Sequence, residues 1–174
     1  MCKTDRNGYA AIGEIAVAGG LISTYITYLF SFNCYAYAMG EYGKWLVPGK
    51  GKKNTHGKKV NMPKKYTAKD VSQWVIKDFS KKVVRKLKNS KSKLGKGEYR
   101  IAIRVQKKYK EGKFYETEDF HFWKQDPKSS AWYDKPGSGE LRYLGNVNAD
   151  SSSYWGDYNS KTVYMAVKRK FTTN

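Results

Sequence analysis

The sequence predicts an α+β fold in which N-terminal helices pack on an antiparallel sheet. Three observations predict it. Apolar residues make up 40% and aromatic residues 16% of the 174 residues, which is typical of a chain with a folded core. Helical spacing of apolar residues is confined to the first half, and the period-two alternation of strands fills the second half. The length fits one domain, which we take as residues 1–174.

Residues 9–30 and 34–46 are each expected to be helical. The first segment predicts a buried helix, or a helix pair broken at Gly19-Gly20. The second is expected to end at Val47-Pro48-Gly49, because glycine and proline terminate helices.

The clearest helix is expected from Ala68 to Leu87. Thr67 and Asp70 have the spacing of a capping box, and apolar residues recur at helical spacing as far as Leu87. A flexible basic linker is expected over 88–97. Four strands are expected in the second half, where apolar and polar residues alternate. They span residues 99–106, 114–124, 131–134 and 162–171, with a hairpin turn at 110–113.

Residues 15–40 contain no charged side chain and follow Lys3 and Arg6, an arrangement superficially like an export signal or a membrane span. Their serine, threonine, asparagine and tyrosine content favours a buried segment instead. We therefore expect a cytoplasmic or virion protein without a membrane partner, and secretion stays open.

The positive charge is concentrated in one segment. The formal charge is +19, and residues 44–113 hold 24 lysines and arginines against four acids. Such a segment predicts an anionic partner, such as nucleic acid or a cell-wall polymer, or else a solubilising surface. The residues that we expect to bind anions are Lys81, Lys82, Arg85, Lys86 and Lys88.

Two cysteines and two histidines carry the remaining chemistry. They are too few for a disulfide framework, which favours a reducing compartment. Their scattered positions match no zinc spacing, so neither a metal nor a cofactor is expected. His56 lies among lysines and glycines and reads as a surface residue. Cys34 and His121 are then the candidates for a nucleophile and its base.

Cys34, in the stretch SFNCYAYAMG, either fills the core or acts as a nucleophile. It stands where the second helix should begin, and a helix N-terminus lowers the pKa of a thiol. Backbone N–H groups at that point could hold an oxyanion. Asn33 and Tyr35 flank the cysteine and are candidate donors to the same site.

His121 lies on one arm of an expected hairpin whose loop spans 125–130. That register places Asp134 directly opposite His121 on the same face of the sheet, whereas a slip by one residue would separate them. A carboxylate there would orient the imidazole and leave its second nitrogen for Cys34. This arrangement is the nucleophile, base and orienting group of a catalytic triad.

Two blocks, NCYAYAMG and DFHFWKQDPKSSAWYDKPG, resemble papain-like, NlpC-like cysteine hydrolase domains of bacteria, phages and large viruses. The resemblance implies a papain-like fold and peptide or isopeptide substrates, cell-wall peptide among them. The family typically has histidine where Asp134 precedes Lys-Pro-Gly, but papain-like enzymes accept Asn, Asp, His or Gln as the orienting residue. The matching positions are Asn33, Cys34, Tyr35, Tyr37, Ala38, Asp119, His121, Phe122, Trp123, Gln125, Trp132, Asp134, Lys135, Pro136 and Gly137.

Two functions follow from these observations. The first is a cysteine peptidase or amidase that acts through Cys34, His121 and Asp134 on a peptide substrate, with a basic surface that holds an anionic polymer. The alternative is a non-catalytic basic structural protein on a degenerate papain-like fold, such as a capsid-associated component whose partner is nucleic acid or a viral shell protein. The reactivity of the Cys34 thiol distinguishes the two.

Overall fold

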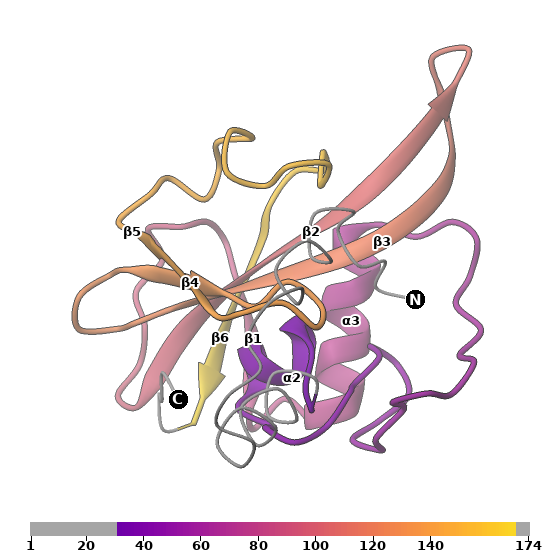
Figure 1. Cartoon of the computed structure of the whole chain (residues 1–174). Coiled ribbons are helices and arrows are strands. Elements are labelled where there is room, and N and C mark those ends of the chain that lie inside the picture. The colour runs from indigo at the N-terminus through magenta and orange to yellow at the C-terminus, as the bar shows by residue number, and fades with distance from the viewer. Residues whose placement is uncertain (1–30, 170–174) are drawn as a thin grey trace, which may run out of the picture.

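The computed structural model describes residues 31–169, so the helices expected over 9–30 lie outside the described residues. Within that range, two helices precede a six-stranded antiparallel sheet (Figure 1). The α+β class is therefore confirmed. The elements are α2 (Cys34–Met39), α3 (Ala68–Phe79), β1 (Val84–Leu87), β2 (Glu98–Lys110), β3 (Lys113–Gln125), β4 (Trp132–Asp134), β5 (Arg142–Gly145) and β6 (Val163–Lys168).

The sheet has the strand order β1-β6-β2-β3-β4-β5, and other segments pack against both of its faces. On one face, α2 contacts β3 and β4, while α3 contacts β1, β2 and β6. Every side chain of α2 is buried there. On the other face, the connection between β5 and β6 supplies Trp155, whose ring stacks on Trp123 with 3.9 Å between centroids. The sheet is thus held between helices and an aromatic loop.

β2 and β3 form a long hairpin that projects beyond the other helices and strands of residues 31–169 (Figure 1). Glu111 and Gly112 at its turn both have positive φ, which the twist of a tight hairpin favours. The turn expected at 110–113 is confirmed. Tyr109 and Tyr115 are exposed near the end of this hairpin.

α3 ends at Phe79, so the helix expected through Leu87 is wrong in its second half. The capping box at its start is present, with Thr67 and Asp70 bonded reciprocally. Ser80 then takes φ of 71°, which interrupts the helix. Val84 and Leu87 lie instead on β1, whose backbone pairs with β6. The β-branched pair at 83–84 favours this strand.

α2 ends at Met39, several residues before the predicted end at residue 46. Gly40 has φ of 67°, and its N–H bonds to carbonyls of the last turn, which is the usual left-handed helix cap. Residue 45 is then held by the next loop, because Thr55 donates its backbone N–H and its hydroxyl to the carbonyl of Trp45.

A buried lysine holds α2 over the sheet. Lys124 of β3 is fully buried, and its Nζ donates to the hydroxyl of Tyr42 at 3.0 Å. The same ammonium group lies 4.8 Å from the ring centre of Tyr37 and 5.0 Å from that of Tyr99, within the range of cation–π contacts. Burial lowers the pKa of Lys124 to about 7.

Candidate active site

His121 on β3 and Asp134 at the end of β4 form a buried hydrogen bond. Nε2 of His121 lies 2.9 Å from Oδ2 of Asp134, and both residues are at most 3% exposed. The register pairs Asp134 with Trp123 and not with His121, because the hairpin loop spans 126–131 instead of 125–130. The predicted register is therefore wrong by two residues. A shift of two keeps each side chain on its face, so Asp134 reaches His121 diagonally.

The surroundings of His121 favour its charged form. Burial alone would lower the pKa of His121, but the hydrogen bond with Asp134 and the interaction with Cys34 raise it to about 10. Burial also opposes ionisation of Asp134, yet hydrogen bonds from Arg142 and His121 hold its pKa below the ordinary value. These contacts favour an imidazolium beside a carboxylate.

Cys34 is the first residue of α2 and interacts with the imidazole of His121. Its side chain is fully buried. Because Nε2 is bonded to Asp134, Nδ1 is the ring nitrogen left for the sulfur. Nδ1 makes no hydrogen bond of regular geometry within residues 31–169. Loose contacts between nucleophile and base are common without substrate. The three predicted catalytic residues thus lie in the order thiol, imidazole, carboxylate.

Arg142 on β5 is a site residue that the sequence analysis missed. Its Nε donates to Oδ1 of Asp134 at 2.9 Å, and its Nη2 donates to Oδ2 at 2.5 Å. This two-point contact holds the carboxylate plane and adds a positive charge beside it. Arg142 faces Asp134 in the pairing of β4 and β5. β5 is a short strand without clear alternation, so no signal in the sequence placed Arg142 there.

Asp119 and Tyr158 support the other side of the imidazole. The ring of Tyr158 stacks on that of His121 at 5.0 Å between centroids, and its hydroxyl donates to Oδ2 of Asp119 at 2.8 Å. Burial, and next the electrostatic interaction with Cys34, raise the pKa of Asp119 to about 7. In the sequence, Asp119 stands out only as a position that matches the papain-like pattern. Tyr158, from the connection before β6, carried no signal.

Asn33 and Tyr35 do not point their polar groups at the thiol site, which corrects the expectation that they donate to it. Oδ1 of Asn33 accepts from the N–H groups of Ala36 and Leu46, and its Nδ2 donates to the carbonyl of Leu46 at 2.7 Å. The hydroxyl of Tyr35 donates to Asp78 at 2.9 Å. Asn33 therefore caps α2 and anchors the chain after it, while Tyr35 links α2 to α3.

The basic residues expected to bind anions lie at and before the outer strand β1, not along a helix. Lys81 and Lys82 are exposed in the turn before β1. Arg85 already has a carboxylate partner, since its Nη2 lies 2.6 Å from Oε2 of Glu98. Lys86 and Lys88 are exposed at the end of the same strand. Arg85 is therefore less available to an external anion than the four lysines Lys81, Lys82, Lys86 and Lys88.

Residues 31–169 contain no group of three or more histidine, cysteine, aspartate or glutamate side chains placed to hold a metal ion. In the same range, no helix is long and apolar enough to cross a bilayer. No protein-family model, curated protein or solved structure matches the chain.

Proposed function

We propose that the chain is a cysteine hydrolase of the papain-like kind that cleaves amide bonds in peptides, isopeptides or cell-wall peptides. One observation supports this best. Nε2 of His121 is bonded to Asp134, while Cys34 interacts with the same imidazole. A thiol, a base and an orienting carboxylate in that order are the parts that nucleophilic catalysis at an acyl carbon needs.

In the first half of the reaction, the Cys34 sulfur attacks the carbonyl carbon of the amide. The proton of the Cys34 thiol resides on His121 during this attack. The resulting imidazolium is stabilised by the Asp134 carboxylate, 2.9 Å away. His121 then gives this proton to the amide nitrogen. The carbon–nitrogen bond breaks, the amine leaves, and a thioester to Cys34 remains.

In the second half, neutral His121 takes a proton from a water molecule as the water oxygen attacks the thioester carbonyl. The carbon–sulfur bond breaks, the carboxylic acid leaves, and the proton returns to the thiol and imidazole pair. Arg142 keeps Asp134 ionised and fixed in plane through both halves, because it donates to both oxygens of the carboxylate.

The basic segment would bind an anionic polymer. Exposed lysines at 81, 82, 86 and 88 provide positive charge at the outer strand of the sheet, apart from the buried triad. A cell-wall polymer or a nucleic acid could bind such a surface through its negative groups.

A second candidate function is favoured by one observation. Cys34 is 0% exposed, so a substrate reaches it only when a covering segment moves. A permanently enclosed thiol would suit a non-catalytic structural protein, such as a capsid-associated component with a nucleic acid or shell protein as partner. In that case the triad geometry serves only to hold α2 against β3.

Acyl transfer from p-nitrophenyl acetate tests the proposal without knowledge of the natural substrate. The acetyl group should pass to the Cys34 sulfur with release of one p-nitrophenolate per chain in a rapid burst. A Cys34→Ala variant and a His121→Ala variant should lose the burst, whereas Cys2→Ser, as the matched control, should keep it. Absence of the burst in the unmodified chain, or its persistence in Cys34→Ala, would favour the structural protein.

A further inference from the structure

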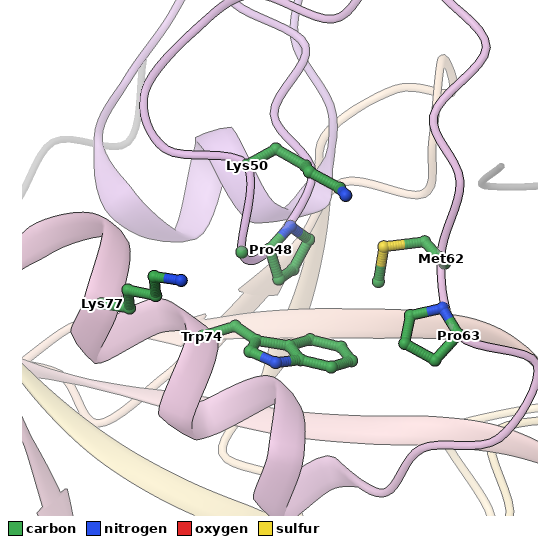
Figure 2. Close-up of a pocket in the computed structure, with 7 residues that line it drawn as sticks. Pro48, Lys50, Met62, Pro63, Trp74 and Lys77 are labelled. Atoms are coloured by element: carbon green, nitrogen blue, oxygen red, sulfur yellow. The ribbon is translucent and has the colours of Figure 1, made fainter.

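A shallow hollow lies between α3 and the loop that follows α2, lined by α3 and by parts of the chain near residues 48–50 and 62–63 (Figure 2). The indole of Trp74 forms its floor. Pro48 lies over the ring, Lys77 stands at one end, and Met62 and Pro63 stand at the other. Lys50 extends over the rim. The described lining thus combines a half-buried indole with two cationic side chains.

Hydrogen bonds to one carboxylate hold the loop of this hollow against α3. Asp78 accepts from the N–H groups of Gly49 and Gly51, each at 2.8 Å, and from the hydroxyl of Tyr35. Gly49 has φ of 85°, and a β-carbon there would lie 3.2 Å from Cγ of Trp74. The loop can therefore approach the indole closely only with glycine at this position.

The size of the hollow limits its occupant to one small group. Its volume is about 160 Å³, whereas pockets that enclose a whole small ligand measure about 300–1,000 Å³. One planar ring of a larger molecule fits that space better than a complete free ligand. A ring laid flat on Trp74 would stack on the indole face.

The charge around the hollow favours an anionic occupant. Residues 42–69 contain nine lysines and no acid. Lys50 and Lys77 belong to the lining itself, and no carboxylate is among the described lining residues. A planar ring flanked by negative groups could therefore stack on the indole of Trp74 and pair its negative groups with Lys50 and Lys77.

We infer that this hollow binds one base of a single-stranded nucleic acid, with the base stacked on Trp74 and the neighbouring phosphates bound by Lys50 and Lys77. Aromatic platforms combined with a positively charged track are the general means of binding single strands without sequence preference. The surrounding lysines of residues 42–69 would extend the track. This site is independent of the thiol chemistry and goes beyond the proposed hydrolase.

The backbone of the lining argues against an acidic peptide as the occupant. Peptides in grooves are commonly held by main-chain hydrogen bonds. Pro48 and Pro63 have no N–H to donate, and the N–H of Gly49 is already bonded to Asp78. The lining therefore offers ring faces and ammonium groups, which match bases and phosphates.

The first test uses the unmodified protein, so that folding of a variant is not in question. Binding of a ten-nucleotide oligothymidylate is compared at low salt with that of a ten-unit abasic strand carrying the same phosphates. If a base stacks in the hollow, the abasic strand should bind about 5- to 160-fold more weakly, the range that one stacked base contributes. Equal binding of both strands would overturn the inference.

The second test locates the stacking. Trp74→Ala should lose about 5- to 160-fold in affinity for oligothymidylate and nothing for the abasic strand, and Trp74→Phe should lose less. Tyr109→Ala, an exposed aromatic on the hairpin, is the matched control and should bind as the unmodified chain does. Equal losses at residues 74 and 109, or a loss in Trp74→Ala that is the same for both strands, would contradict the assignment.

A third test separates the hollow from general electrostatic attraction. The double variant Lys50→Gln, Lys77→Gln should weaken binding more than Lys91→Gln, Lys96→Gln, which removes the same charge elsewhere in the basic segment. Equal effects would show attraction by charge alone and overturn the site. Displacement of the oligothymidylate by an equally charged polyglutamate at equal concentration would do so too. Cys34→Ala should bind normally, so failure of the hydrolase proposal leaves this result intact.

Discussion

Nε2 of His121 lies 2.9 Å from Oδ2 of Asp134, although the two residues are not paired across β3 and β4. The contact is diagonal. His121 lies two residues before Trp123 on β3, and Trp123 is the direct partner of Asp134. Because pairing with β4 covers only the last residues of β3, His121 lies beyond the end of that pairing. Its imidazole is thereby supported by Asp134 and interacts with Cys34.

Asp134→Asn tests whether the carboxylate charge holds the imidazole as a cation. The amide keeps the size of the side chain but removes the charge, so the pKa of His121 should fall from its raised value of about 10. The free energy of unfolding should drop by about 1.5–3 kcal/mol, the contribution of a hydrogen bond to a charged group. Nuclear magnetic resonance of the His121 ring measures the first effect, and urea denaturation the second. An unchanged His121 titration would contradict the assignment of Asp134.

The stability of the chain should depend on the protonation of His121. Its folded pKa, about 10, lies above the unfolded value of about 6.5. The stabilising contribution is therefore complete below pH 6.5 and is lost as pH rises from 6.5 through about 10. Denaturation midpoints of the unmodified chain and His121→Gln, measured at pH 6 and pH 9, should differ more at pH 6. A difference that grows with pH would reverse the sign and refute the ion pair.

The hairpin shows how far the sequence could predict the site. Counting residues through a six-residue loop placed Asp134 on the face of His121, and the hydrogen bond is present although the register differs by two. The predicted face of Asp134 is correct because side chains alternate with a period of two, so a shift of two residues leaves each side chain on the same face. Arg142 and Tyr158 could not be found in this way, because each comes from a separate segment that only the tertiary structure brings to the site.

The end of α3 shows a different limit. Val83 and Leu87 fit the apolar stripe of a helix as well as they fit a strand, so periodicity alone could not separate the two. The structure ends the helix at Phe79 because Ser80 leaves the helical region and residues 84–87 gain backbone partners in β6. Those partners are about 80 residues away in sequence, and no local pattern indicates them.

Arg142→Lys tests the two-point contact with Asp134. Lysine keeps the positive charge but cannot donate to both carboxylate oxygens from a planar fork. Arg142 is half-exposed, so solvent screens the pair and the loss of stability should stay below about 1 kcal/mol. The p-nitrophenolate burst should slow more in Arg142→Lys than in Lys128→Gln, a control at an exposed lysine of the β3–β4 loop. Equal burst rates in both variants would show that the fork does not position Asp134.

Gly49→Ala tests the close packing of the loop on Trp74. Gly49 and Gly57 both have positive φ, so alanine is strained at either position. Only at Gly49 would the new β-carbon lie 3.2 Å from the indole, since nothing lies within 4 Å at Gly57. Gly49→Ala should therefore lower the thermal midpoint more than Gly57→Ala. The reverse order would show that the loop is not held against Trp74.

The reactivity of Cys34 tests the central claim most directly. In a Cys2→Ser chain, the rate of alkylation by iodoacetamide is followed from pH 4 to pH 10. A thiol paired with the His121 imidazolium should react well below pH 8.5, the ordinary pKa of a cysteine thiol, and His121→Ala should shift the profile upward toward that value. If Cys34 reacts only after denaturation, or reacts with a profile centred near pH 8.5 that His121→Ala leaves unchanged, the thiol is a core residue and the chain is no cysteine hydrolase.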